Sequence, residues 1–482
     1  MRLLVSALLA LSVVVSGSSA AGAAVAPERL DTARIDSFVD DYLDRHGLVG
    51  AGVAVVHDGE VIHASGRGEG NDAPAAADTP FSTGSVGKAV TAFAVLQLVD
   101  DELVDLDDPV AWHVPEFELA DSRQGEVTIR QLLSHTSGIP SPTIVPPAQD
   151  LTEGVANLRN LELASEPGQA HSYSNSNFHL AARLVEVVTG TPFKEYLDDE
   201  VFSPLGMADT VAVDTTRADH PGTQHGHITA YGAALPGPAL DQLVAGSGGV
   251  VTTAEDMARF TAMLTDEGRT ASGEQLLSSV LLAEAHTPQL AAERYGLGWQ
   301  LSSSGTEPAR GGHSGSTTRY SAQLHVVPDS GYGVVVMLNS FTPTYEHPYE
   351  LSSGIIDLTE GDAATTGAPI PALIDVALGL ATLLALGLTV LGIRRAGAWA
   401  GRRSERSGWT YALRLAPQAA FPVLAVVLFG VVPTLQNNSS TPYDVLTVWP
   451  AAMVLVIALA VSGVMLIGAR AWNRRDGRAV GS

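Results

Sequence analysis

The 482-residue sequence contains no cysteine, which excludes disulfide bonds and thiolate metal sites. The fold must therefore be stabilised by the burial of apolar side chains. The 14 histidines include no H-E-x-x-H motif of the kind that binds catalytic zinc. We therefore expect neither a metal nor a cofactor.

Positive charge is scarce and unevenly distributed. The chain has only two lysines, Lys88 and Lys194, and 25 arginines. Residues 27–367 hold 16 Lys and Arg against 48 Asp and Glu, a net charge of −32, whereas residues 368–482 hold 10 against 4, a net charge of +6. So acidic a domain is a poor partner for nucleic acid or anionic surfaces. We attribute its charge to solubility rather than to a specific cationic ligand.

The N-terminus has the composition of a secretory signal. A positively charged start is followed by an apolar run over residues 3–15 and by small residues up to position 26. We predict a signal peptide over residues 1–26. An uncleaved membrane anchor is the alternative, although the apolar run is shorter than the roughly 20 residues that a span needs. Both interpretations place the following domain outside the cytoplasm.

Three apolar segments near the C-terminus, residues 372–393, 415–435 and 448–469, are each long enough to cross a bilayer as a helix. Six arginines follow the first segment and four follow the last, whereas the remaining connection has none. By the positive-inside rule, this pattern predicts a multi-pass membrane protein with a cytoplasmic C-terminus and an extracytoplasmic domain. Asp375 is predicted to be interfacial. A plain anchor is the favoured role, and partner binding is the alternative.

Residues 27–360 are predicted to form one domain, joined to the membrane helices by a linker over residues 361–371. Helical spacing over residues 31–46 is followed by two alternating segments around Asp58-Gly59, a pattern typical of a β-hairpin. Alternation returns in three later segments, residues 295–301, 319–327 and 332–338.

The strongest chemical signal is Ser85-Val86-Gly87-Lys88, which opens an apolar run at helical spacing. The spacing places Ser85 and Lys88 on one face of the first turn of a buried helix. Serine needs a neighbouring base to act as a nucleophile, and lysine one turn away can supply it. Free backbone N–H groups at the start of a helix also suit a developing oxyanion. A simple helix-capping role for Ser85 is the alternative.

Further downstream, Tyr173-Ser174-Asn175 combines a phenol that can move a proton with an amide that can hold a polar substrate group. The alternative is a polar surface turn. His135 is a second candidate base. Because Lys88 already supplies one, we predict instead that the His135 ring hydrogen-bonds loop backbone.

The motifs Ser85-x-x-Lys88, Tyr173-Ser174-Asn175 and His313-Ser314-Gly315, in this order, resemble the three motifs of the serine β-lactamase and penicillin-binding-protein superfamily, in particular its class C branch. The resemblance covers roughly residues 30–358. It implies an α/β two-lobed β-lactamase/transpeptidase-like fold, in which an antiparallel sheet flanked by helices lies beside a helical lobe. Three transmembrane helices are expected to follow.

The resemblance also implies the roles of the catalytic groups. Ser85 would be the acylated nucleophile, and Lys88 and Tyr173 would share the general-base and proton-relay work. The N–H groups of Ser85 and Ser316 would form the oxyanion hole. Whether Lys88 is neutral, or stays charged beside an ionised Tyr173, is open at this point.

The substrate-binding residues implied by the resemblance are Asn175, His313 and Gly315. Typical β-lactamases carry lysine where His313 stands. Histidine, with a pKa of about 6.5, is mostly neutral at pH 7, so weaker capture of an anion is expected. This departure favours the esterase, D-aminopeptidase and peptide-hydrolase relatives, with residual β-lactamase activity as a further option.

We therefore predict a membrane-anchored, exported serine hydrolase that cleaves an ester or amide through an acyl-enzyme. Its substrate would be a small molecule or a peptide, with cell-wall-derived, D-amino acid and β-lactam-like compounds as candidates. An α/β-hydrolase esterase is one alternative, but Thr83-Gly84-Ser85-Val86-Gly87 lacks the first glycine of G-x-S-x-G. A non-catalytic wall-binding or membrane scaffold is the other, and the intact set Ser85, Lys88 and Tyr173 argues against it.

Overall fold

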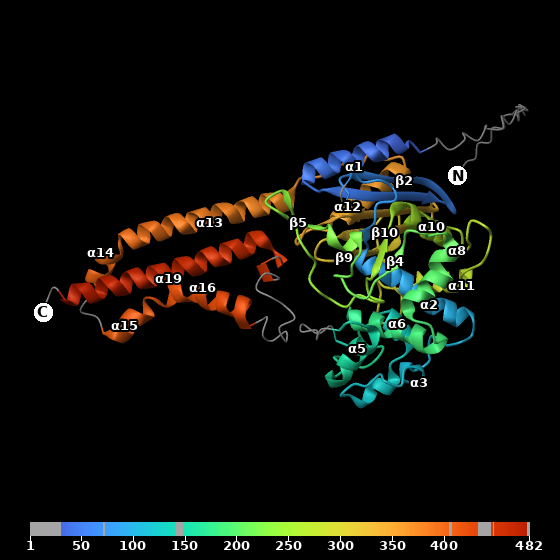
Figure 1. The fold of residues 1–482 in the computed structure, drawn as a ribbon, viewed down its shortest axis with the longest axis horizontal. Coiled ribbons are helices and arrows are strands. Elements are labelled where there is room, and N and C mark those ends of the chain that lie inside the picture. The colour runs from blue at the N-terminus through green and yellow to red at the C-terminus, as the bar shows by residue number, and fades with distance from the viewer. Residues whose placement is uncertain are drawn as a thin grey trace, which may run out of the picture.

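The computed structural model describes residues 30–70, 73–140, 148–403, 407–431, 445–446 and 448–479. The predicted signal peptide, residues 1–26, lies outside these ranges. A domain of mixed sheet and helix ends at α12 (His347–Thr359), and a group of long helices extends away from it (Figure 1).

The main sheet has six strands in the order β2-β1-β11-β10-β9-β8, and every neighbouring pair is antiparallel. Its strands are β1 (Gly50–His57), β2 (Glu60–Gly68), β8 (Gln300–Leu301), β9 (Gly311–Ser316), β10 (Ser321–Val327) and β11 (Tyr332–Leu338). The predicted hairpin at Asp58-Gly59 joins β1 to β2, and β1 pairs with β11, so the N-terminal hairpin adjoins the C-terminal strands. The implied antiparallel sheet is thus confirmed. The strand predicted over residues 295–301 is shorter, because only its last two residues pair with β9.

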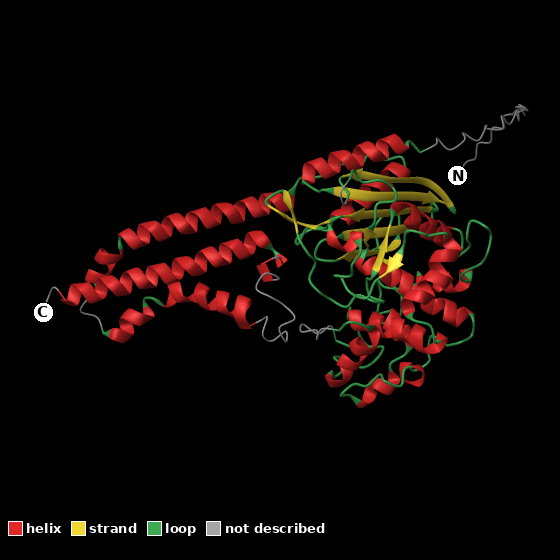
Figure 2. Ribbon diagram, viewed as in Figure 1, coloured by secondary structure: helices red, strands yellow, loops and turns green. Residues whose placement is uncertain are grey.

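Successive side chains of β1 contribute to two different cores, as the alternation of a strand requires. Val53 and Val55 pack in a cluster with α1 (Thr32–His46) and α12, whereas Ala54 and Val56 belong to the larger cluster with α10 (Ala254–Thr265). Helices therefore cover both faces of the sheet (Figure 2). These helices hold the sheet that forms one wall of the candidate site.

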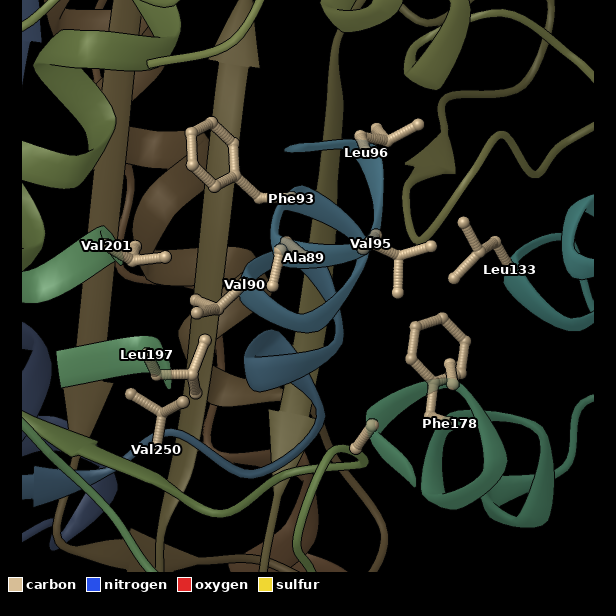
Figure 3. Close-up of a cluster of buried hydrophobic side chains, with 14 of the residues drawn as sticks. Ala89, Val90, Phe93, Val95, Leu96, Leu133, Phe178, Leu197, Val201 and Val250 are labelled. Carbon is tan, nitrogen blue, oxygen red and sulfur yellow. The ribbon is translucent and has the colours of Figure 1, made fainter. Parts of the chain in front are cut away.

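The helical lobe is centred on α2 (Gly87–Asp100), whose first twelve residues are all buried. Around it lie α4 (Ile129–Leu133), α6 (Asn175–Thr189) and α7 (Phe193–Leu197). Phe93, Leu133 and Phe178 pack in this core together with side chains from the other elements (Figure 3). Because α2 is apolar on nearly every side, it forms the interior of the domain.

Ser85 lies in the 3₁₀ turn η1 (Gly84–Val86), immediately before α2, rather than in the first turn of the α-helix itself. The chain enters this turn through Gly84, whose φ of +53° is the left-handed conformation that glycine adopts most easily. The spacing of three residues still brings Ser85 and Lys88 to one side, because a 3₁₀ turn also brings residues i and i+3 together.

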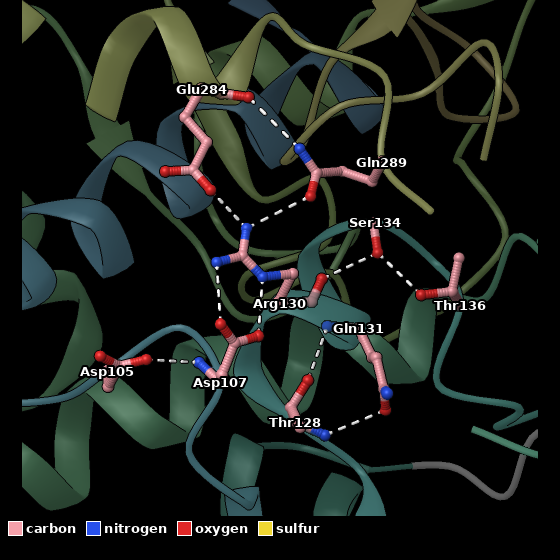
Figure 4. Close-up of polar contacts among 9 residues, drawn as sticks. All are labelled: Asp105, Asp107, Thr128, Arg130, Gln131, Ser134, Thr136, Glu284 and Gln289. Atoms are coloured by element: carbon pink, nitrogen blue, oxygen red, sulfur yellow. Dashed lines mark hydrogen bonds and ion pairs between the residues drawn. The ribbon is translucent and has the colours of Figure 1, made fainter. Parts of the chain in front are cut away.

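Helix α4 is fixed by its cap and by one arginine. Thr128 and Gln131 form a reciprocal capping box at its start. The Nε of Arg130 donates a hydrogen bond to Asp107 Oδ1 at 2.8 Å, and its guanidinium group also contacts Glu284 (Figure 4). This network ties α4 to segments before and after it in sequence, and α4 in turn leads directly into His135.

Beyond the domain, α13 (Ile370–Arg394) and α19 (Pro450–Ala479) carry the two stretches of the described ranges that are apolar and long enough to cross a membrane. The segment predicted as a membrane helix over residues 415–435 does not form one long helix like α13 or α19. It comprises α16 (Ala416–Val426), which contains Pro422, and the five-residue π-turn η5 (Val427–Val431), and together they are too short to qualify. Residues 432–435 lie outside the described part, so the expected third full-length helix is not reproduced.

The two long helices run in the same direction. At the end next to the domain, Trp449 Nε1 donates to Asp375 Oδ1 at 2.9 Å, and farther along α13, Gly392 lies against Leu466 of α19. Helix α16 runs the opposite way, because Gln418 lies beside Gly463 while Tyr411, seven residues earlier, donates to the carbonyl of Arg470 at 2.7 Å. The three helices form one elongated group (Figure 1).

Candidate active site

Lys88 is fully buried at the start of α2 and makes three polar contacts. Its Nζ lies 3.0 Å from Ser85 Oγ, 2.8 Å from Asn175 Oδ1 and 2.6 Å from the backbone oxygen of Ser247. Burial lowers the pKa of Lys88 well below its ordinary value, because the charged form loses its hydration. The structure thus brings the predicted pair Ser85 and Lys88 together, with Lys88 disposed to be neutral.

Ser247 was not singled out from the sequence. It lies in the segment Gly246-Ser247-Gly248-Gly249, whose glycines allow close approach: a Cβ at position 248 would lie 3.0 Å from the carbonyl carbon of Gly84. Thr91 Oγ1 donates to the carbonyl of Gly246 at 2.6 Å and fixes the segment to α2. A run of small residues is the one sequence signal that indicated a backbone contact here.

Tyr173 lies on the other side of Lys88. The centre of its ring is 4.9 Å from Lys88 Nζ. Burial raises the pKa of Tyr173 to about 12, and a hydrogen bond with Ser85 acts in the opposite direction. The phenol is therefore protonated near neutral pH, which suits a proton donor or relay more than a ready base.

Asn175 begins α6, so the helix itself orients the side chain. Its Oδ1 accepts from Lys88, which leaves its amide NH₂ to face outwards from an exposed residue. The residue expected to bind a substrate amide thus also fixes the amine of Lys88. Both contacts are compatible, because an amide has separate donor and acceptor groups.

The backbone at the end of β9 packs tightly against η1. A Cβ at Gly84 would overlap the nitrogen of Ser316, and a Cβ at Gly315 would lie 2.8 Å from the nitrogen of Ser85. The two N–H groups expected to form the oxyanion hole therefore lie at one end of the same cleft. Only glycine permits this approach, which gives Gly315 a steric role beside its predicted contact with substrate.

His313 corrects the expectation that this residue edges the cleft. The side chain of His313, a residue of β9, is completely buried. Its Nε2 lies 2.9 Å from Tyr295 Oη, and its Nδ1 lies 2.5 Å from the backbone oxygen of Ser314. Burial lowers the pKa of His313 to about 3, so the ring is neutral at pH 7. It fixes Tyr295 and does not line the cleft, whereas Ser314 and Gly315 do.

His135 positions the second motif. Its Nδ1 accepts from the backbone N–H of Ser174 at 3.2 Å and lies 3.0 Å from Asn177 Nδ2. Burial is the main reason why the pKa of His135 is well below its ordinary value. The predicted contact with backbone is present, although its partner is the Tyr173 turn rather than the residues next to His135. The residue holds φ at +57°, an uncommon conformation outside glycine.

The cleft consists of two adjoining cavities. One, of about 660 Å³, is lined by Ser85, Gly315 and Ser316 and by the wall over residues 341–349. The other, of about 430 Å³, shares Tyr173 with the first. No cluster of three or more metal-ligating side chains occurs within the described ranges.

A sequence profile of the Beta-lactamase family matches residues 35–352, about two thirds of the chain. The chain belongs to the Beta-lactamase family. Penicillin-binding protein 4 of Amycolatopsis lactamdurans is 31% identical over 318 residues, which cover 62% of this chain and 83% of that protein. Protein flp of Staphylococcus aureus (strain MW2) is 27% identical over 64% of this chain, which spans only 62% of flp.

Two solved structures share the fold of this chain. The octameric penicillin-binding protein homologue from Pyrococcus abyssi superposes with a TM-score of 0.60 at 24% identity. The match covers 69% of this chain and 78% of the homologue's chain. A D-stereospecific amidohydrolase from Streptomyces sp. superposes with a TM-score of 0.53 at 25% identity. The match covers 64% of this chain and 94% of the amidohydrolase chain. The relatives support a serine hydrolase of this family.

Proposed function

We propose that the chain is a membrane-anchored serine hydrolase that cleaves an ester or amide through an acyl-enzyme on Ser85, with Lys88 as the general base. The observation that carries this proposal is the contact of the fully buried Lys88 Nζ with Ser85 Oγ, together with the burial that favours the neutral form of the amine. A neutral amine has two N–H groups and one lone pair. Asn175 Oδ1 and the Ser247 carbonyl can only accept, so they take both N–H groups. The lone pair then faces Ser85 Oγ, 3.0 Å away.

In the proposed reaction, Lys88 removes the hydroxyl proton as Ser85 Oγ bonds to the substrate carbonyl carbon. The N–H groups of Ser85 and Ser316 stabilise the resulting oxyanion. When the tetrahedral intermediate collapses, the bond to the leaving group breaks, and that group receives the proton from Lys88 through Tyr173. Water then attacks the acyl-enzyme by the same route, which releases the acid and restores Ser85.

For the substrate, we propose an ester or an amide of the D-amino acid or peptide type. Two named relatives, a penicillin-binding protein and a D-stereospecific amidohydrolase, support this class. At the position where typical β-lactamases carry lysine, the buried, neutral His313 offers no cation to an antibiotic carboxylate, which is a reason to rank β-lactams below esters and amides.

We further propose three membrane crossings, with the hydrolase domain on the extracytoplasmic side. Helices α13 and α19 both run away from the domain. The chain between them must therefore run back towards the domain, and α16 has this direction. Arginines follow α13 and occupy the end of α19, away from the domain. This distribution supports a cytoplasmic location for those ends.

The proposal can be tested by intact-mass spectrometry of the detergent-solubilised full chain, treated with a fluorophosphonate or with penicillin. A stoichiometric fluorophosphonate adduct that maps to Ser85 and is absent in Ser85→Ala is the expected result. The penicillin sample reports whether β-lactams are acceptable acyl donors. If the folded wild-type chain remains unlabelled by both reagents, the catalytic proposal fails and a non-catalytic scaffold becomes the better interpretation.

A further inference from the structure

The second cavity contains the positive charge that His313 does not supply. Its lining includes Arg310 and Arg294 together with Tyr173, whereas Ser85 and Ser316 line only the first cavity. A substrate attached at Ser85 can therefore extend past Tyr173 towards two guanidinium groups. This arrangement is unusual in a domain where acidic residues outnumber basic ones by 48 to 16.

Arg310 has no acidic partner within 4.0 Å among the residues that the structure describes. Its Nη2 lies 3.5 Å from Tyr349 Oη, its Cζ lies 5.5 Å from the centre of the Tyr349 ring, and its Nε is buried without a hydrogen-bond partner in the same described part. Several other arginines of the domain do have acidic partners, as Arg130 has Asp107 and Arg183 has Glu116. A buried guanidinium N–H without an acceptor is costly, so an acceptor from outside is expected.

The surroundings of Arg310 favour an anion as that acceptor. Glu346 is the one carboxylate that lines this cavity, against the two arginines. His171 and His325 also line it, and burial lowers the pKa of both, that of His325 to about 3, so neither adds charge at pH 7. The residues that line the cavity therefore carry a net positive charge, and Asp357, which interacts with Arg310 electrostatically, lies outside this lining.

The backbone keeps Arg310 in place at the start of β9. Its N–H donates to Ser302 Oγ at 3.1 Å, and its carbonyl accepts from the N–H of Ser302 at 2.9 Å. The aromatic ring of Tyr349 lies beside the guanidinium. An arginine fixed in this way is suited to paired hydrogen bonds with a carboxylate.

We infer that Arg310 binds a carboxylate of the substrate, so that the preferred substrates are esters or amides with an acidic group a few bonds from the scissile linkage. This inference rests on the proposed function for its reaction, but the binding site can be tested separately. The acidic group belongs either to the acyl part or to the leaving group, and the experiment distinguishes the two.

Two pairs of esters, tested on the full chain in detergent, provide the comparison. Para-nitrophenyl hemisuccinate against para-nitrophenyl butyrate places the charge in the acyl part. The butyrate ester of para-hydroxybenzoate against that of its methyl ester places the charge in the leaving group. In one of the two pairs, Arg310→Gln should lower the ratio of kcat/KM for the anionic ester to kcat/KM for the neutral ester by about 10- to 100-fold, as expected for the loss of one charge-assisted pair. Most of this change should be an increase in KM for the anionic ester.

Arg310→Lys should restore part of this ratio, because it keeps the charge without the planar geometry. Arg159→Gln, at an exposed position, controls for the loss of one positive charge from the domain. Equal losses on both members of each pair, or an unchanged ratio in both pairs, would overturn the inference.

Binding to Ser85→Ala separates this inference from the proposed reaction. Calorimetric titration of this variant with monobutyl succinate should show binding that weakens in the Ser85→Ala, Arg310→Gln double variant. Such a difference supports the anion site even if the wild-type chain hydrolyses no ester. Equal affinity of the two variants overturns the site even if Ser85 is labelled.

Discussion

The Nε2 of His179 lies 3.0 Å from Ser247 Oγ, and both side chains are buried next to Lys88. The His179 ring also hydrogen-bonds the backbone of Leu243. His179 therefore contacts the segment over residues 243–247 at both ends. The carbonyl of Ser247 in this segment accepts a hydrogen bond from Lys88. Burial lowers the pKa of His179 to about 3. The ring is neutral and positions the general base without touching substrate.

Substituting His179→Ala should lower kcat/KM by about tenfold, because a small displacement of a catalytic group is enough to slow a reaction. The loosened segment should also admit water to Lys88 and raise its pKa, so that the acid limb of the pH–rate profile moves to higher pH. His179→Gln, which keeps a polar group, should recover part of both effects. A lower rate with an unmoved acid limb would indicate a purely structural role.

The pH dependence of hydrolysis should reflect Lys88. Because the proposed base must be neutral, kcat/KM should fall with unit slope as the pH drops through the pKa of Lys88. Burial lowers that pKa, so the midpoint should lie well below about 10.4, the ordinary lysine value. The profile is to be measured with para-nitrophenyl butyrate, corrected for spontaneous hydrolysis. Activity that rises only near the ordinary lysine pKa would contradict a neutral Lys88.

Gly84→Ala should abolish most activity. The added Cβ would overlap the Ser316 nitrogen, and φ at position 84 is +53°. Displacement of one oxyanion N–H is expected to cost about 100-fold in kcat. Gly125→Ala is the matched control, because a Cβ there meets nothing within 4 Å. Circular dichroism and urea unfolding should establish that the variant folds. A folded Gly84→Ala chain with normal kcat would exclude the proposed oxyanion hole.

Asp375 should fix the domain to helices α13 and α19. Its Oδ2 accepts from the backbone N–H of Tyr231, in the turn between β5 (His227–Ala230) and β6 (Ala233–Pro236), and its Oδ1 accepts from Trp449. Asp375→Ala removes both acceptors. Proteolysis of the segment between α12 and α13, residues 360–369, should therefore become up to about tenfold faster.

Thr382→Val is the control for Asp375→Ala. Thr382 lies on the same helix, and its hydroxyl bonds only within it, to the Leu378 carbonyl at 2.9 Å. The linker of this variant should be cleaved at the wild-type rate. Equal cleavage of all three chains would show that Asp375 does not tether the domain.

Several features were predictable because they depend on local pattern. The hairpin at Asp58-Gly59 follows from alternation and a turn dipeptide, and the proximity of Ser85 and Lys88 follows from their spacing. The order of the three motifs indicated the family. Such signals act within a few residues or are carried by the residue types themselves, so they can be read without knowing what packs against what.

The sequence by itself therefore determined the family, the antiparallel sheet and the pairing of Ser85 with Lys88. Only the tertiary structure decided that His313 is buried, that the Ser247 carbonyl takes an N–H of Lys88, and that Arg310 lies in a cavity without an acidic partner in the described residues. These properties arise between residues far apart in the chain. Burial, and the electrostatic energies that it sets, depend on which distant segments exclude water from a group.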